Sequence, residues 1–156
     1  MVLLERLCLW LETKLYSFRF YLRMRSTKGK PNSNLTTRHW LFIRSVGKGW
    51  QPMVAELIMT LRDLGYLEIQ QVKEKFGTLR FYCSCEPEGR PLIEFVERMS
   101  ENICEYCGDR GESREDLSWV STLCNRCYTP KRKQQQEMEA EFAREEAKRE
   151  EIKIKE

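Results

Sequence analysis

The chain has 156 residues, of which 41% are hydrophobic and 33% are charged, a composition typical of one globular domain with appendages. No apolar stretch is long enough to span a bilayer, and the N-terminus lacks the cleavage pattern of a secretory signal, which predicts a cytoplasmic protein. The net charge of +3 is unevenly spread, because residues 1–50 carry ten Lys and Arg against two Glu. A basic first third followed by a mildly acidic body predicts contact with an anionic surface.

Residues 1–38 read as a basic amphipathic extension that consists of a helix and a loop. The helix is predicted over residues 2–24, because apolar side chains recur there at steps of three and four. The turn-forming composition of residues 26–37 predicts a loop. The apolar stripe favours a helix that packs against a core, and the alternative is a helix that binds a partner or a membrane surface. The stripe consists of Leu4, Leu7, Cys8, Leu11, Leu15, Phe18 and Leu22.

Residues 39–103 are predicted to form the α+β body of the protein. His39 to Ile43 is an apolar run too short to assign, and His39, the only histidine, is interpreted as a packed or exposed residue rather than a ligand. A helix is predicted over residues 51–64, with Pro52 in its first turn and Gly65 at its end. The preceding Gly-Lys-Gly lacks the length and ending of a phosphate-binding loop, so a tight turn is expected there.

A β-hairpin is predicted next, because residues 67–75 and 78–85 are compatible with strands and Phe76-Gly77 lies between them as the turn. In the second strand apolar and polar side chains alternate, which is typical of a half-buried antiparallel strand. Cys83 and Cys85 share the apolar face and are interpreted as small core residues rather than as metal ligands. A third helix, opened by Pro91, leads to Cys104. The predicted fold is α+β: a small antiparallel sheet packed by helices, with a zinc-ribbon-like module and helical extensions at both termini.

Four cysteines in residues 104–128 indicate a metal site. Cys104, Cys107, Cys124 and Cys127 form two Cys-x-x-Cys pairs separated by sixteen residues, the spacing of a four-cysteine zinc site. The chain has seven cysteines, an odd number, and no secretory signal, which argues against the alternative of disulfides. Four thiolates close the coordination sphere of zinc, so a structural ion is favoured over a catalytic one.

The cysteine segment has few apolar residues with which to fold by itself. Four of them are expected to form a small cap over the metal: Leu117, Trp119, Val120 and Leu123. Gly108 directly follows a ligand, where a positive φ is often needed. Metal binding must therefore supply the folding free energy, and Cys107→Ser is expected to collapse residues 104–127 while the hairpin and its helices stay folded.

Residues 129–156 form a charged tail made almost entirely of helix-forming residues. Its large apolar residues, Met138, Phe142, Ile152 and Ile154, are too few for a sustained coiled-coil seam. A solvated charged helix or a partly disordered tail is expected.

The segment Val72 to Cys83, VKEKFGTLRFYC, together with the cysteine module, resembles a family of small uncharacterised proteins encoded mainly by bacteriophages and prophages. In that family a helix containing Gly-Trp precedes a Lys-Glu-Lys-Phe-Gly-x-Leu-Arg-Phe-Tyr hairpin, and a cysteine-pair zinc module follows. Gly49-Trp50 and Lys73 to Tyr82 match the first two elements, and the match covers roughly residues 40–130. The resemblance implies a phage accessory protein but brings no established activity.

Three functions are compatible with these features. The first is a non-enzymatic interaction module, in which one structural zinc ion shapes a surface that binds a host or phage protein. The second is nucleic-acid binding through the hairpin and the basic N-terminal region, since cations contact phosphates and aromatic side chains stack on bases. The third is a protein that binds or sequesters a nucleotide. The sequence shows no nucleophile beside the cations, which argues against an enzyme. The candidate contacts for a nucleic acid or an anion are Lys73, Lys75, Phe76, Arg80 and Tyr82. No catalytic residues are expected.

Overall fold

The computed structural model of the protein describes residues 35–155. The helix predicted over residues 2–24 and most of the following loop lie outside this range. The described elements are α2 (Thr37–Arg44), α3 (Gln51–Leu64), β1 (Leu67–Lys75), β2 (Thr78–Cys85), α4 (Gly89–Ser100), β3 (Glu112–Arg114), β4 (Ser121–Leu123) and α5 (Asn125–Lys155). Helices and two small antiparallel sheets confirm the predicted α+β class.

Strands β1 and β2 form the predicted hairpin, paired from Leu67 opposite Cys85 to Lys75 opposite Thr78. The register shifts between Ile69 and Gln71, which marks a bulge in β1 that the sequence did not predict. Phe76 and Gly77 form the two-residue turn and both have positive φ, 52° and 73°. A type I′ turn requires positive φ at both central residues, and its twist matches that of the strands.

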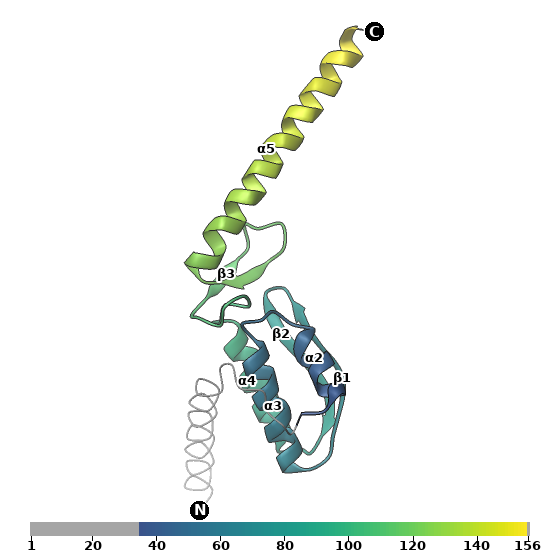
Figure 1. Ribbon diagram of the computed structural model, residues 1–156, viewed down its shortest axis with the longest axis vertical. Helices are drawn as coiled ribbons and strands as arrows, with labels where there is room; N and C mark the ends of the chain where they lie inside the picture. The colour runs from purple at the N-terminus through teal and green to yellow at the C-terminus, as the bar shows by residue number, and fades with distance from the viewer. Residues whose placement is uncertain (1–34, 156) are drawn as a thin grey trace, which may run out of the picture.

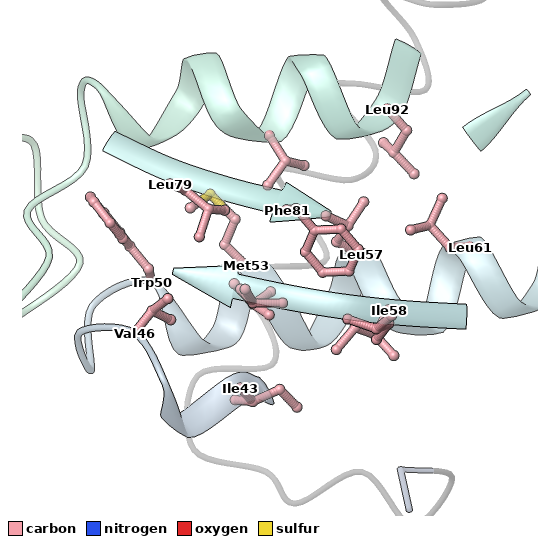
Figure 2. Packing of buried hydrophobic residues seen from close by; sticks show 14 of the residues in the cluster. Ile43, Val46, Trp50, Met53, Leu57, Ile58, Leu61, Leu79, Phe81 and Leu92 are labelled. Carbon is pink, nitrogen blue, oxygen red and sulfur yellow. The ribbon is translucent and has the colours of Figure 1, made fainter. Parts of the chain in front are cut away.

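The core of the body lies between the hairpin and α3. Figure 2 shows α3 crossing behind the hairpin, with α4 beside β2 and α2 beside β1, and buried side chains filling the space between these layers. A two-stranded sheet is marginal by itself, so packing by helices is what makes this one stable. The buried apolar residues are Leu35, Ile43, Val46, Trp50, Met53, Val54, Leu57, Ile58, Leu61, Ile69, Val72, Leu79, Phe81, Leu92 and Val96.

Side chains from α4 and from the C-cap of α2 form hydrogen bonds with the backbone at both edges of the hairpin. On the β2 edge, the Leu79 amide donates to Ser100 Oγ at 2.8 Å and the Phe81 amide donates to Glu97 Oε1 at 2.7 Å. On the β1 edge, Ser45 Oγ donates to the Val72 carbonyl at 2.6 Å. Exposed strand edges invite pairing with other chains, and these side chains disfavour it.

The apolar run at His39 belongs to α2, which begins at Thr37. The predicted loop over residues 26–37 is therefore wrong at its last residue. Thr36 is the N-cap of α2, and its side chain and that of His39 form a capping box. Helix α4 begins at Gly89, two residues before Pro91, while α3 and its end at Gly65 are confirmed.

The charged tail is helical up to Lys155, and its helix begins at Asn125 rather than within the tail. Figure 1 shows α5 extending away from the other elements as one long rod. Its side chains over residues 136–150 are exposed, including Met138 and Phe142. Between residues 35 and 155, no helix combines the length and apolar character required to cross a bilayer.

Candidate metal centre

The four cysteines of the two Cys-x-x-Cys pairs converge on one point. The Sγ atoms of Cys104, Cys107, Cys124 and Cys127 all lie within 4.8 Å of one another, and that of Cys107 lies 3.6 Å from that of Cys124. The first pair lies in the loop after α4, whereas Cys124 follows β4 and Cys127 lies in the first turn of α5. All four are free thiols, so the cluster can hold a metal ion.

Local backbone geometry aims each pair at this point. Gly108 has a φ of 77°, as expected for the residue after the second cysteine, and its amide donates to the Cys104 carbonyl at 2.9 Å. The Cys104 amide donates to the Asp109 carbonyl at 2.7 Å, which closes the first knuckle. In the second pair, the Cys127 amide donates to the Cys124 carbonyl at 3.1 Å. Each knuckle is therefore one tight turn with its two sulfurs on the same side.

Burial and the neighbouring thiols disfavour ionisation of Cys127. Burial, followed by hydrogen bonds with Cys124, Cys107 and Cys104, raises the pKa of Cys127 to about 12. Thiolates are the metal-binding form of cysteine, so a divalent cation must supply the positive charge that offsets them. Arg126 lies beside the cluster, where it forms an ion pair with Asp109 at 2.8 Å.

The apolar cap over the cluster is smaller than predicted. Leu117 and Leu123 are buried together with Cys104, which confirms half of the predicted cap. Trp119 is 61% exposed, so its predicted place in the cap is wrong. Its Nε1 atom instead donates to Glu74 Oε2 at 2.8 Å, and this contact draws the indole out towards the hairpin.

The loop before α3 lies directly on the first knuckle. The Gly49 amide donates to the Glu105 carbonyl at 2.7 Å, and Trp50 Nε1 donates to the Ile103 carbonyl at 2.7 Å. A Cβ atom on Gly49 would lie 2.1 Å from the Cys104 carbonyl oxygen, and one on Gly47 would lie 2.3 Å from that of Glu105. The predicted turn is present, since the Trp50 amide donates to the Gly47 carbonyl, but contact with the knuckle is what requires both glycines.

The turn of the hairpin forms a second contact with the cysteine module. Glu74 Oε1 accepts from the Gly77 amide at 2.6 Å, while its other oxygen accepts from Trp119. Thr122 Oγ1 donates to the Gly77 carbonyl at 2.7 Å, and a Cβ atom on Gly77 would lie 3.2 Å from Ser121 and Thr122 backbone atoms. Two residues of the Lys-Glu-Lys-Phe-Gly motif, Glu74 and Gly77, are therefore explained by the contact between the hairpin turn and the module.

Three residues weighed as ligands lie elsewhere. His39 Nδ1 accepts from the Thr36 amide at 3.2 Å in the capping box of α2. Cys83 and Cys85 are half-buried against the core of the body, and burial followed by a hydrogen bond with Cys85 raises the pKa of Cys83 to about 12. The interpretation of both cysteines as core residues is therefore confirmed.

The structure places the five candidate contact residues on the hairpin, and none of them belongs to the cysteine cluster. Lys73 lies opposite Arg80 in the register, and Lys73 Nζ lies 5.2 Å from the centre of the Tyr82 ring. Lys75 Nζ lies 5.5 Å from the centre of the Phe76 ring at the turn. These residues therefore form one group on the outward side of the hairpin.

No family model, curated protein or solved structure matches this chain. The interpretation of the centre therefore depends on its geometry.

Proposed function

We propose that this protein is a non-enzymatic interaction module whose binding surface is held in shape by one structural zinc ion. The observation that carries the proposal is the convergence of four thiols from two knuckles, at the place where the loop before α3 and the hairpin turn both contact the cysteine module. A metal at this point fixes three segments that are distant in sequence.

The geometry supports zinc with a closed coordination sphere. Zinc–sulfur bonds of about 2.3 Å in a tetrahedron place neighbouring sulfurs about 3.8 Å apart. The separation of 3.6 Å between Cys107 Sγ and Cys124 Sγ is close to this value, and the limit of 4.8 Å for the whole cluster accommodates it. Four thiolates leave no position for an activated water, which supports a structural rather than a catalytic ion.

Metal content is the direct test. Native mass spectrometry of freshly purified, reduced protein is expected to find one zinc ion per chain, and Cys107→Ser is expected to lose it. Cys83→Ser is the matched control, because Cys83 is a half-buried cysteine outside the cluster. Wild-type protein without bound metal, or with all four thiols freely alkylated, would contradict the proposal.

We further propose that the partner is a macromolecule of a host cell and that the protein is a cytoplasmic, phage-encoded accessory protein. The resemblance carried by residues 72–83 and by the cysteine module supports this assignment, and free thiolate ligands suit a reducing compartment. Capture experiments from host lysate should recover a specific partner with the wild-type protein and lose it with Cys107→Ser. Equal recovery by both proteins would show that the metal centre does not shape the binding surface.

A further inference from the structure

We propose that the outward side of the hairpin binds single-stranded nucleic acid, with Lys73, Lys75 and Arg80 contacting phosphates and with Phe76 and Tyr82 stacking on bases. We call these five residues the hairpin face. The inference rests on the proposed function, because the cysteine module holds the turn of this hairpin in place.

The positive charge of the hairpin face is not neutralised by neighbouring acids. Lys73 and Arg80 are cross-strand partners, and Lys75 follows on the same side of β1. Among the residues that the structure describes, none of these three cations takes part in an ion pair. The side chain of Glu74 lies on the opposite side of β1 from Lys73 and Lys75, where it accepts hydrogen bonds from Gly77 and Trp119. Unpaired cations grouped in this way complement the charge of a phosphate backbone.

Two exposed aromatic rings lie among these cations. Tyr82 is 44% exposed and Phe76 is 68% exposed. Phe76 also has a φ of 52°, a strained conformation for a residue with a large side chain. An Asn-Gly turn would adopt the same backbone more readily, so the turn is less stable than it could be and displays an aromatic ring instead. Such a ring beside a lysine is suited to stacking on a base.

The arrangement favours a single strand over other partners. Addition of a partner strand to the sheet is disfavoured, because side chains of α4 and of Ser45, the C-cap of α2, occupy backbone groups on both edges. A duplex hides the faces of its bases, whereas a single strand offers them for stacking. An acidic protein segment would use the cations but would give the exposed rings no base to stack on.

Fluorescence anisotropy with labelled oligothymidine and oligouridine of about 12 nucleotides tests the inference, since this length covers one small stacking site. We expect the logarithm of the association constant to fall linearly with the logarithm of the salt concentration. The slope should be about −2, the value for three phosphate contacts on a single strand. The DNA and RNA arms show which of the two strands is preferred, and a duplex of equal length should bind more weakly.

Two variants identify the surface that binds. The triple variant Lys73→Gln, Lys75→Gln, Arg80→Gln should lose both the affinity and the salt slope. Its matched control removes three positive charges from exposed positions of α5, through Arg144→Gln, Lys148→Gln and Arg149→Gln, and should retain both. Phe76→Asn should weaken binding by about 10-fold, the loss expected for one stacked base, while leaving the unfolding midpoint unchanged or higher.

Several results would overturn the inference. They are no binding at low salt, equal losses in the two triple variants, unchanged binding by Phe76→Asn, and duplex binding as tight as single-strand binding. Displacement by polyglutamate at the same concentration of negative charge would assign the hairpin face to an acidic protein instead. Each of these results can occur in protein that carries one zinc ion per chain, so the inference can fail while the proposed metal centre stands.

Discussion

In the body, residues 39–103, the fully buried side chains include Trp50, Met53 and Leu57, whereas the buried residues of the hydrophobic cluster in the cysteine module are Cys104, Leu117 and Leu123. Burial of apolar surface stabilises the body, at about 25 cal/mol for each Å² removed from water. The module buries too little apolar surface to fold in this way, so under the proposed function it depends on its metal ion. The two regions of this short chain are therefore expected to draw on different sources of folding free energy.

The two regions are nevertheless connected through specific polar contacts. Trp50 belongs to the core of the body but donates to the carbonyl of Ile103, next to the first ligand. Thr122 belongs to the module but donates to the carbonyl of Gly77 in the hairpin turn. Loss of the metal should therefore destabilise the body locally at these contacts, and the effect should decrease with distance from them.

The largest effect is expected from Cys107→Ser. Structural zinc contributes on the order of 10 kcal/mol to folding, so residues 104–127 should lose protection from hydrogen exchange. The exchange of the Gly49 amide should also accelerate, because its acceptor is the carbonyl of Glu105. The core strands and α3 should remain protected, since their buried cluster includes no residue of the module.

Hydrogen exchange followed by mass spectrometry checks this prediction, with Cys83→Ser as the control. Exchange confined to residues 104–127 would show that the body does not depend on the module at all. Cooperative loss of protection in the entire body would show the opposite, that the metal is part of a single folding unit.

Trp50→Ala tests the connection from the side of the body. Removing a fully buried tryptophan typically costs about 3–5 kcal/mol of unfolding free energy, and here it also leaves the Ile103 carbonyl without its donor. Trp50→Phe keeps most of the packing and should cost about 1–3 kcal/mol, the effect of the unpaired carbonyl. Urea unfolding of both variants, together with their zinc content, separates packing from the contact with the knuckle. A Trp50→Phe variant as stable as the wild type, with unchanged zinc content, would contradict a role for the hydrogen bond.

Gly49→Ala tests the close approach of the two regions. The added Cβ atom would lie 2.1 Å from the Cys104 carbonyl oxygen and 2.4 Å from the Gly108 nitrogen, so the loop and the knuckle must separate. We expect a loss of about 3 kcal/mol, the upper end of the usual cost of overpacking, and weaker zinc retention against a chelator. Lys48→Ala, at the exposed position between the two glycines, should change neither measurement.

Ser100→Ala probes the body alone and should leave the metal centre intact. The buried Ser100 hydroxyl accepts from the Leu79 amide, and its removal leaves that amide without a partner at the β2 edge. The expected cost is about 1–3 kcal/mol, measured by urea unfolding. Ser84→Ala, at an exposed position of the same strand, should have little effect. A change in zinc content of Ser100→Ala would contradict the separation of the two regions.

The smallest effect is a pH dependence that arises at α2. Burial, followed by the positive charges of Arg62 and Arg38, lowers the pKa of His39 below its usual value of 6.5. The folded state therefore favours the neutral ring, whose Nδ1 accepts from the Thr36 amide. This stabilisation is present above pH 6.5 and is lost as the pH falls through the lower pKa of the folded state. The loss should stay below about 1 kcal/mol, the usual contribution of an N-cap.

Urea unfolding between about pH 7.5 and about pH 5.5 measures the His39 effect. The variant His39→Gln keeps an acceptor for the capping box but has no group that titrates in this range. The wild-type protein should lose more stability than the variant over this interval. Equal losses would contradict the prediction.

Local patterns predicted the elements that depend on neighbouring residues. The spacing of the cysteines predicted the cluster. The alternation of apolar and polar side chains, together with Phe76-Gly77 at the turn, predicted the bounds of the hairpin. Pro52 and Gly65 placed α3, because their backbone preferences act within one turn of the helix. Cys83 and Cys85 were assigned to the core from their strand face alone.

Contacts between distant segments could not be predicted in the same way. Gly47 and Gly49 are required by a knuckle almost sixty residues further along the chain, so their sequence neighbours give no indication of it. Trp119 was predicted to cap the metal because it is apolar and nearby, but its indole N–H finds an acceptor on Glu74 of the hairpin. Nothing in the sequence around Ser100 and Glu97 indicates that they accept hydrogen bonds from β2, because these contacts exist only once α4 packs beside that strand.

Residue patterns alone were enough to predict the four-cysteine cluster, the α+β class and the bounds of the hairpin, since periodicity, turn chemistry and cysteine spacing act over a few residues. The contacts of the cysteine module with the hairpin turn and with the loop before α3, and the absence of ion pairs on the hairpin face, emerged only from the three-dimensional arrangement. These properties depend on which surfaces meet in space, and steric fit and hydrogen-bond satisfaction across such contacts are set by the whole fold.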